Sequence, residues 1–393
     1  MEYTVVFIGN YLPDKQESMQ RVTLLYKDII EKAGIRCELV RPVERVGKLC
    51  ALFPSITKWL FYIDKYLLFT IELFFYSLIR RSNPNIVYHI TDHSNAIYSL
   101  CLPGRTKVVT CHDVLAIQSM LGNVPHNTIK LLGKLLQKSI LIGLQSSPTI
   151  ICVSKNTERE LRSIISNKTV NIFTVYQPLN YDFKSFNRNY SLKIIGVIPE
   201  LFDVSLSHGF ILHVGGNQWY KNRIGVCKIY ANLLLLRSAL GQSSLPLVLA
   251  GAPPSAELLE YTNRHKELPI IYLTSPTNME INALYSLASL LPFPSISEGF
   301  GWPIVEAMAC GCPVVTTGRQ PMTEAGGDSA IYINPSDIQG AAGILNEILQ
   351  WSFDRRIHQI QLGYENIKRF SRIDFLKSYL SAYDYSLNLA PRK

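Results

Sequence analysis

Two glutamates eight positions apart, Glu298 and Glu306, flank a turn that contains glycine and leads into a short apolar segment. Pro303 suits the first position of a helix, because its φ is fixed and it has no N–H to leave unpaired. The helix should cover residues 304–310 and end at Gly311. Glu298 would then lie on the loop before the helix, and Glu306 one turn inside it.

The amino end of this helix predicts a phosphate site. Its backbone N–H groups point outward at the positive end of the helix dipole. A carboxylate on either side of a diphosphate could each hold a sugar hydroxyl, one on a ribose and one on a second sugar. The segment therefore favours a nucleotide-sugar site, and a strand–turn–helix with two solvated glutamates is the alternative. The predicted contacts are Gly299, Phe300, Gly301, Trp302, Pro303 and Glu306.

A second loop, which follows a predicted strand over residues 210–214, combines glycines with positive charge. Two consecutive glycines let the backbone approach a ligand closely, and a lysine soon afterwards supplies a cation for a diphosphate. An ordinary turn with a surface lysine is the alternative. The candidates in this loop are Gly215, Gly216, Lys221, Asn222 and Arg223.

Both segments resemble the nucleotide-sugar domain of the retaining glycosyltransferases of family 4, the glycosyl transferases group 1. That family carries two glutamates with seven residues between them, a spacing that Glu298 and Glu306 match. The resemblance extends without a gap over residues 294–335. It implies that Glu306 binds the ribose and that Glu298 holds the sugar ring, together with the backbone amides of residues 300 and 301.

The glycine loop resembles the family's Gly-Gly…Arg-Lys-Asn loop, in which a basic pair stabilises the leaving diphosphate. Lys221 and Asn222 match this pattern, whereas Tyr220 stands where the family often has arginine. Arg223 is a candidate substitute, two to three residues out of register. The resemblance therefore implies a role for Lys221 at the diphosphate and leaves the second cation open.

The resemblance also implies the mechanism. The acceptor hydroxyl would attack from the face that the leaving group departs, and the leaving phosphate would help to take up the proton. The sequence has no Asp-x-Asp pair where a metal-bridged diphosphate would need one, and no His/Cys cluster with ligand spacing. Lys221 and helix amides would then stabilise the leaving charge, and we expect no metal ion and no cofactor.

Three polar residues at the ends of predicted strands are the catalytic candidates of the first half, beside Glu298 and Lys221 of the second. His93 follows a strand over residues 86–90, and His112 with Asp113 follows another over 107–110. Such residues gather at one edge of a parallel sheet, and the resemblance implies that they lie near the acceptor and the transferred sugar. A core or capping histidine bonded to the backbone is the alternative for each.

Short apolar runs alternate with helical patterns, which predicts an α/β fold of parallel sheets with crossover helices. Two Rossmann-like domains facing a cleft, the GT-B architecture of the family, are the simplest assembly. An acceptor-side domain should cover residues 1–190, and a nucleotide-sugar domain residues 208–369. A last helix at about 370–393 could pack back on the first domain, and the region 180–207 resembles a linker.

The charge of the chain is uneven. Residues 1–200 hold 24 Lys and Arg against 15 Asp and Glu, whereas residues 201–393 hold 15 of each. A basic half favours an anionic partner, such as a membrane surface or a phosphate-bearing lipid, and a merely soluble basic surface is the alternative. Nucleic acid is not expected, because no recognition module is present.

The apolar segment from Trp59 to Ile79 bears on the membrane question. Charged residues at 64, 65 and 72 interrupt it, so we do not expect it to span a bilayer. A buried or partly exposed helix pair and an amphipathic contact with the inner leaflet are the two interpretations. The cysteine pattern and the absence of a signal-peptide pattern predict a cytoplasmic protein, with peripheral contact at the inner membrane face.

The sequence therefore predicts a retaining, metal-independent glycosyltransferase. It would move a sugar from a nucleotide sugar to a glycan or lipid-linked acceptor in the synthesis of surface or exported polysaccharide. A nucleotide-sugar hydrolase or epimerase on the same scaffold is an alternative, and a non-catalytic nucleotide-sugar-binding protein is another. The sequence does not specify the base, the sugar, the acceptor or the oligomeric state.

Overall fold

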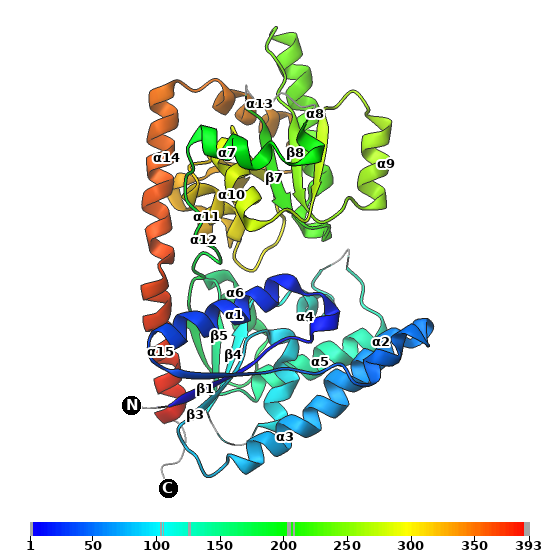
Figure 1. Ribbon diagram of the computed structural model, residues 1–393, viewed down its shortest axis with the longest axis vertical. Helices are drawn as coiled ribbons and strands as arrows, with labels where there is room; N and C mark the ends of the chain where they lie inside the picture. The colour runs from blue at the N-terminus through cyan, green and yellow to red at the C-terminus, as the bar shows by residue number, and fades with distance from the viewer. Residues whose placement is uncertain are drawn as a thin grey trace. The chain divides into compact units, whose positions relative to one another are not determined.

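The computed structural model describes residues 3–102, 104, 106–124, 127–202, 206 and 209–388. The chain divides into two compact units, each of α/β construction (Figure 1). Unit 1 comprises Met1–Asn180 and Arg372–Lys393, and unit 2 comprises Tyr181–Ser371. The predicted domain boundary at residue 190 lies within helix α7 of unit 2, which packs on helix α10.

Unit 1 contains a six-stranded, wholly parallel sheet in the order β2-β1-β3-β4-β5-β6. Strands β3 and β4 match the runs predicted at residues 86–90 and 107–110 to within a residue at each end. The edge strand β6 was missed, because its side chains are only half-buried and give no continuous apolar run. The strands are β1 Thr4–Ile8, β2 Arg36–Val40, β3 Ile86–Ile90, β4 Lys107–Cys111, β5 Thr149–Cys152 and β6 Asn171–Thr174.

Helices cover both faces of this sheet. Helices α1 and α15 lie on one face, and α3, α5 and the 3-10 helix η5 lie on the other. The other, shorter helices lie within the connections between these elements. The helices of unit 1 are α1 Glu17–Lys32, α2 Thr57–Tyr62, α3 Phe69–Ile79, α4 Leu115–Met120, α5 Leu131–Gln145, α6 Lys155–Ile164 and α15 Arg372–Asn388, with the 3-10 helices η1 Leu12–Asp14, η2 Val46–Ala51, η3 Pro54–Ile56 and η5 His93–Cys101 and the π-helix η4 Ile63–Leu68.

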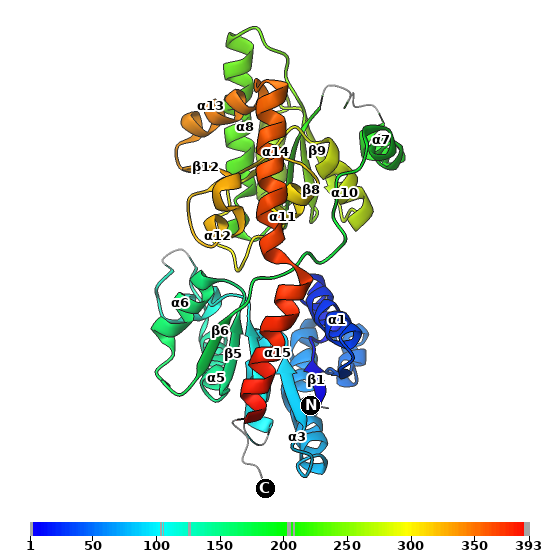
Figure 2. The same cartoon turned by 90° about the vertical axis from the view of Figure 1, so that its left-hand side faces the viewer.

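Buried rings fix the C-terminal helix α15 to unit 1. Tyr379 and Phe375 both pack on Tyr26 of α1. The Tyr383 hydroxyl lies 2.8 Å from the His89 ring nitrogen Nδ1 on β3. Figure 2 shows α15, in red, running along the strands of this sheet. Because His89 faces this interface, its side chain has a structural role.

Unit 2 contains six parallel strands in two groups of three, β7-β8-β9 and β10-β11-β12. A parallel bridge between Ile211 and Leu290 joins β7 to the start of β10. Helices α8 and α13 pack together over one apolar core. The strands are β7 Ile211–Gly215, β8 Leu247–Gly251, β9 Ile270–Thr274, β10 Leu291–Phe293, β11 Val314–Thr317 and β12 Ile331–Ile333.

The helices of unit 2 follow its strands as crossovers or cap its edges. Residues 203–205 and 207 of the segment predicted as a linker at 180–207 lie outside the described residues, and its described part contributes α7 and η6 to this unit. They are α7 Arg188–Ile195, α8 Arg223–Ala239, α9 Ala256–Arg264, α10 Asn278–Leu287, α11 Trp302–Ala309, α12 Met322–Gly326, α13 Ile338–Leu349 and α14 Phe353–Ile367, with the 3-10 helices η6 Pro199–Leu201, η7 Trp219–Lys221, η8 Gly327–Ser329 and η9 Lys368–Phe370.

The segment predicted as a helix pair at 59–79 is one continuous helical run, α2–η4–α3, with a π-helical centre. Among the described residues, no helix combines the length and the apolar character needed to cross a membrane. All eight cysteines are free.

Candidate active site

The turn before α11 has the predicted form, with a shift of one residue. The helix begins at Trp302, so Pro303 occupies its second position rather than its first. That position also lacks an intrahelical acceptor, so the missing N–H costs no hydrogen bond. Gly301 precedes the helix at φ +103°, a conformation that L side chains rarely adopt. The Ile304 N–H donates to the Gly301 carbonyl at 3.0 Å and closes the first turn.

Lys221 and Glu298 form the central contact of the site. The Lys221 Nζ atom lies 2.8 Å from each carboxylate oxygen of Glu298, although the residues are 77 positions apart. Both side chains are largely buried, at 18% and 8% exposed. The ammonium also lies 5.5 Å from the Phe293 ring centroid. A sugar hydroxyl that reached Glu298 would therefore meet a carboxylate whose orientation is already fixed.

Backbone contacts join the two predicted loops. The Ile296 N–H donates to the Tyr220 carbonyl at 2.7 Å. The Asn222 side chain donates to the Pro294 carbonyl at 3.2 Å. The backbone of Asn222 is left-handed, with φ +56°. A Cβ at Gly216 would lie 2.4 Å from Gln218 Oε1, so a side chain there would displace the exposed end of Gln218. The segments that the sequence assigned separately to phosphate and sugar are therefore one site.

Arg223, the first residue of α8, has unused hydrogen-bond donors. Its Nη1 donates to Asn217 Oδ1 at 2.7 Å and to the Ala252 carbonyl at 3.0 Å. Its Nε and Nη2 atoms are buried and make no hydrogen bond within the described part of the chain. Burial lowers the pKa of this guanidinium. Because an unsatisfied buried donor is costly, a ligand that accepts from both nitrogens would stabilise the site.

His213 is a site residue that the sequence analysis did not identify. Its Nδ1 lies 2.9 Å from the Pro292 carbonyl, which can only accept, so Nδ1 carries the proton. Burial lowers the pKa of His213 to about 4, and Arg223 and Lys221 also disfavour its protonation. The neutral Nε2 is a buried acceptor without a partner among the described residues. A histidine two residues before a double glycine was the available signal.

Glu306 lies one turn inside α11, as expected, and is buried. Its Oε2 accepts from the Tyr285 hydroxyl of α10 at 3.1 Å. Burial, together with the charge of Glu306, raises the pKa of Tyr285 well above its usual value, so the hydroxyl remains a donor. Gly299 precedes the buried Phe300, whose ring packs edge-to-face on Phe370. The hydrogen bond from Tyr285 fixes the direction of the Glu306 carboxylate.

In unit 1, His112 is the more buried of the two candidate histidines. Its Nε2 lies 2.9 Å from the Thr91 carbonyl. Burial lowers the pKa of His112 overall, although Asp92 opposes that shift. Its backbone N–H donates to His93 Nδ1 at 3.3 Å. This is the arrangement expected of the core histidine that we considered as the alternative.

His93 and Asp113 lie closer to solvent, at the carboxyl ends of β3 and β4. The His93 Nε2 atom is 4.0 Å from Asp113 Oδ1, and the Asp113 side chain is 42% exposed. The buried Asp92, which the sequence analysis gave no role, lies 3.5 Å from His93 Nδ1 and accepts from Asn10 at 2.6 Å. Burial opposes ionisation of Asp92, but His93 and His112 bring its pKa below the usual value. The cluster therefore holds one buried and one accessible carboxylate.

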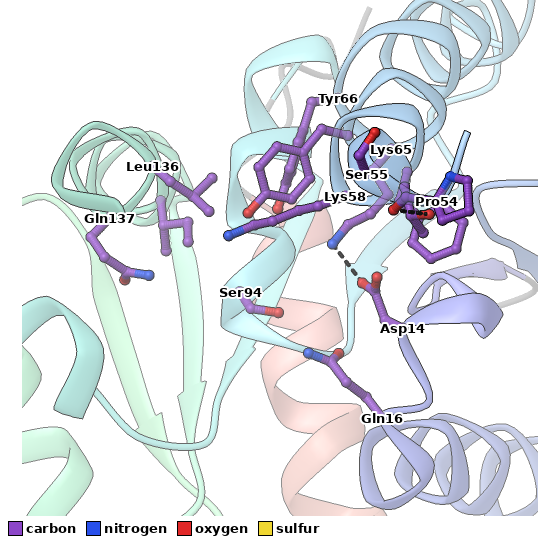
Figure 3. Close-up of a pocket in the computed structure, with 14 residues that line it drawn as sticks. Asp14, Gln16, Pro54, Ser55, Lys58, Lys65, Tyr66, Ser94, Leu136 and Gln137 are labelled. Carbon is purple, nitrogen blue, oxygen red and sulfur yellow. Dashed lines mark hydrogen bonds and ion pairs between the residues drawn. The ribbon is translucent and has the colours of Figure 1, made fainter. Parts of the chain in front are cut away.

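A cavity of about 670 Å³ in unit 1 begins next to this cluster, at Ser94. Figure 3 shows Lys58, Asp14 and Gln16 lining it, with Gln137 of α5 on the opposite side. Lys65 is buried and its Nζ donates to Asp14 Oδ2 at 2.6 Å. Aromatic side chains from α2 and η4 complete the wall. Polar groups combined with aromatic rings suit a saccharide ligand.

The described ranges contain no group of three or more His, Cys, Asp or Glu side chains that could hold a metal ion.

Comparison with known proteins relates part of the chain to a known family. Residues 209–350 match the family model for glycosyl transferases group 1. The O-antigen chain mannosyltransferase B of Escherichia coli is 26% identical over 303 residues, which cover 75% of each chain. The serotype-specific mannosyltransferase WbdA of the same organism is 26% identical over 282 residues, 68% of this chain and 32% of WbdA. The resemblance predicted from the sequence is confirmed.

Solved structures confirm the GT-B fold. A UDP-forming trehalose-phosphate synthase from Burkholderia xenovorans aligns with a TM-score of 0.69 and 12% identity, and covers 98% of this chain and 99% of its own. The sucrose-phosphate synthase of Thermosynechococcus elongatus aligns with a TM-score of 0.68 and 15% identity over the same shares. At these identities the likeness concerns the fold alone.

Proposed function

From the premise that the chain is a glycosyltransferase of the GT-B fold, we propose that it transfers a mannosyl residue, with retention, from a nucleotide sugar to a lipid-linked glycan. The convergence of the two loops of unit 2, joined by Lys221 and Glu298, carries this proposal. Its similarity to O-antigen and serotype-specific mannosyltransferases favours mannose as the sugar and a surface polysaccharide as the product.

The donor site is assigned by hydrogen-bonding chemistry. Glu306 accepts from the ribose hydroxyls, and Glu298 accepts from the hydroxyls of the transferred sugar. Lys221 and the unused nitrogens of Arg223 donate to the diphosphate, close to the amino end of α8. The neutral Nε2 of His213 carries no proton, so it accepts a hydrogen bond from a hydroxyl and cannot donate one to a phosphate oxygen.

The same groups stabilise the departing charge. As the bond to the sugar breaks, negative charge grows on the diphosphate, and the two fixed cations offset it without a metal ion. The acceptor hydroxyl enters from the face that the diphosphate leaves, and its proton passes to the leaving phosphate. The configuration at the sugar is retained, and no residue is required as a general base.

Unit 1 is proposed to bind the acceptor. His93 and Asp113 lie beyond the carboxyl ends of β3 and β4. The cavity next to Ser94 offers polar groups and aromatic rings for the saccharide of the acceptor. We place the enzyme in the cytoplasm, where nucleotide sugars are made available to it, in peripheral contact with the inner face of the membrane.

A turnover assay tests the reaction. Purified protein would be given GDP-mannose and a panel of other nucleotide sugars, a synthetic lipid-linked saccharide acceptor, and EDTA throughout. Release of nucleoside diphosphate with formation of an α-linked product, identified by NMR, would support retention and metal independence. A β-linked product, or activity only after a divalent metal is restored, would contradict those parts of the proposal.

The same assay separates the alternatives. A nucleotide-sugar hydrolase or epimerase would consume the donor equally well without acceptor. A non-catalytic nucleotide-sugar-binding protein would bind the donor and release nothing. The fixed Lys221–Glu298 pair favours transfer over mere binding, because it orients a carboxylate at the sugar.

A further inference from the structure

The outer face of the helical run α2–η4–α3 exposes only large apolar side chains. From position 59 to position 79, every residue that is exposed to solvent belongs to this class, with exposed fractions from 37% at Ile63 to 81% at Ile79. They recur every three to four residues, so they share one face of the helix. This apolar stripe consists of Trp59, Ile63, Leu67, Ile71, Phe74, Phe75, Leu78 and Ile79.

The inner face of the same run fixes it to unit 1. Phe69 and Leu73 are buried in the core of the sheet. The Asp64 carboxylate accepts the backbone N–H groups of residues 45, 46 and 47 and the Tyr11 hydroxyl. Gly47 is required there, because a Cβ would lie 2.8 Å from the Asp64 carboxylate. The inner face of the run is therefore packed and hydrogen-bonded to unit 1, and the apolar stripe remains exposed in the folded unit.

Helix α5 presents a second surface of related character. Between residues 130 and 139 its exposed side chains are three leucines and three lysines. The sequence contains no acidic residue from position 114 to position 157. Helices α2 and α5 line opposite sides of the same cavity (Figure 3). The exposed residues of α5 are Lys130, Leu131, Leu132, Lys134, Leu135 and Lys138.

The charges around the stripe are those of a surface that attracts anions. Unit 1 carries 25 Lys and Arg against 15 Asp and Glu, whereas unit 2 carries 14 against 15. The acidic residues near the stripe are paired with arginines, Glu72 with Arg45 and Glu38 with Arg80. Exposed Lys58 precedes the stripe. Lysine and arginine thus flank an apolar face that carries no acid.

We propose that the apolar stripe and α5 dock unit 1 onto an anionic lipid bilayer. Interfacial helices combine a face of Trp, Phe and Leu with flanking basic residues, and they lie in the plane of the membrane. The continuous stripe and the basic charge of unit 1 fit a bilayer better than a second copy of the chain, which would bring like charges together. The inference deepens the proposed function, because docking would present the cavity to the head of a lipid-linked acceptor.

Vesicle flotation tests the docking surface directly. The full chain would be mixed with vesicles of phosphatidylcholine, with and without phosphatidylglycerol. The triple variant Leu67→Ser, Ile71→Ser and Phe75→Ser removes part of the stripe. The matched control replaces exposed leucines of unit 2, Leu235→Ser, Leu240→Ser and Leu259→Ser.

We expect binding to the anionic vesicles, reduced at least ~100-fold by the stripe variant and unchanged in the control. Replacing Lys130, Lys134 and Lys138 by Gln should weaken binding to anionic vesicles only, whereas the same change at Lys228, Lys266 and Lys368 of unit 2 should not. Circular dichroism would show that each variant is folded.

Three results would overturn the proposal. Wild-type protein that floats with no vesicle, or a stripe variant that binds as well as wild type, would exclude docking by this face. A dimer in light scattering that the stripe variant abolishes, without vesicle binding, would assign the face to a second copy. Turnover on a water-soluble acceptor would be retained in all three cases if the proposed reaction is correct, so the two proposals fail separately.

Discussion

The two units of this chain build their candidate sites in different ways. Unit 2 uses two short segments of sequence, and an ion pair between Lys221 and Glu298 fixes them together. Unit 1 collects side chains from the ends of the neighbouring strands β1, β3 and β4, where Asn10 donates to Asp92 and the His112 N–H donates to the His93 ring. Unit 2 is nearly neutral in net charge, whereas unit 1 carries the whole positive excess.

This difference has a chemical reason. A nucleoside diphosphate presents the same groups in every donor, and a fixed set of cations, amides and carboxylates can bind it. Acceptors differ from enzyme to enzyme, so the site in unit 1 depends on side chains whose partners come from elsewhere in the fold. We therefore expect substitutions in unit 2 to separate cleanly into donor binding and chemistry, and those in unit 1 to mix function with stability.

The largest expected effect is at the sugar end of unit 2. Glu298→Ala should lower turnover by about 10³-fold, because it removes a fixed group at the reacting sugar. Binding of nucleoside diphosphate should change little, since Lys221 remains. Steady-state kinetics and calorimetry would measure the two quantities, with Glu257→Ala on the exposed side of α9 as control. Equal loss of binding and turnover would refute the role given to Glu298.

The second effect concerns the diphosphate end of the same unit. Arg223→Met should weaken binding of nucleoside diphosphate about 10- to 100-fold, because a charge-assisted hydrogen bond contributes ~1.5–3 kcal/mol. The free energy of unfolding should change little, because loss of the bonds to Asn217 and Ala252 is offset by removal of a buried charge with two unsatisfied nitrogens.

Arg237→Met is the matched control for that prediction. Arg237 is also buried on α8, but its Nε donates to the Ser243 carbonyl and its Nη1 to Asn346, whereas the Arg223 Nε makes no hydrogen bond within the described residues. Its replacement should lower stability and leave nucleotide binding unchanged. Calorimetry and urea unfolding would measure both variants. If Arg223→Met destabilises the protein as Arg237→Met does and binds nucleotide normally, Arg223 is structural.

In unit 1, the two candidate histidines are expected to differ, one acting in turnover and the other in stability. His93→Ala should lower kcat/KM at least ~10-fold at unchanged donor binding, because His93 lies between an accessible and a buried carboxylate. His112→Ala should chiefly lower stability, by about 1 kcal/mol or more, through loss of the bond to Thr91. Both would be assayed well below their melting temperatures. Greater loss of turnover in His112→Ala would reverse the two assignments.

The last expected effect is a pH dependence of stability that the units share. Burial lowers the pKa of His213 in unit 2 to about 4 and that of His89 in unit 1 to about 3. An unfolded histidine titrates near pH ~6.5, so the unfolded chain takes up protons first as the pH falls. The stabilisation is complete above that pH and is lost toward pH 4, by ~1.4 kcal/mol per pH unit for each histidine.

Melting curves between pH 7.5 and pH 5 would show this loss. The variant His213→Gln should flatten the dependence for unit 2, because glutamine can still donate to the Pro292 carbonyl but does not titrate. Hydrogen exchange would report each unit separately. An unchanged slope for unit 2 in this variant would mean that His213 does not titrate as its burial indicates.

Part of the fold was predictable because five of the twelve described strands are buried along their whole length. Strands β3 and β4 are examples, and both were predicted to within one residue. The strand β12 was missed for the reason that β6 was, since it is short and half-buried. The π-helical centre of the run at 57–79 also has no sequence pattern that distinguishes it from an α-helix.

The donor site was predictable only where its residues are close in sequence. Glu298, Glu306 and Lys221 occupy recognisable positions in two motifs. The unused donors of Arg223 and the neutral state of His213 depend on contacts with strands β8 and β10, which the sequence does not specify. Asp92 was missed for the same reason, because its burial results from neighbours on β1 and β4.

The central claim is that unit 2 binds a nucleotide sugar without a metal ion. Thermal unfolding of the wild-type protein and of Arg223→Met, in EDTA, against a panel of nucleotide sugars and nucleoside diphosphates tests it most directly. A ligand at about 100 times its dissociation constant stabilises the native state by ~2.7 kcal/mol, which such melts resolve. We predict a rise with one base and sugar in the wild type and a much smaller rise in Arg223→Met. A panel without any rise, or equal rises in both proteins, would contradict the claim.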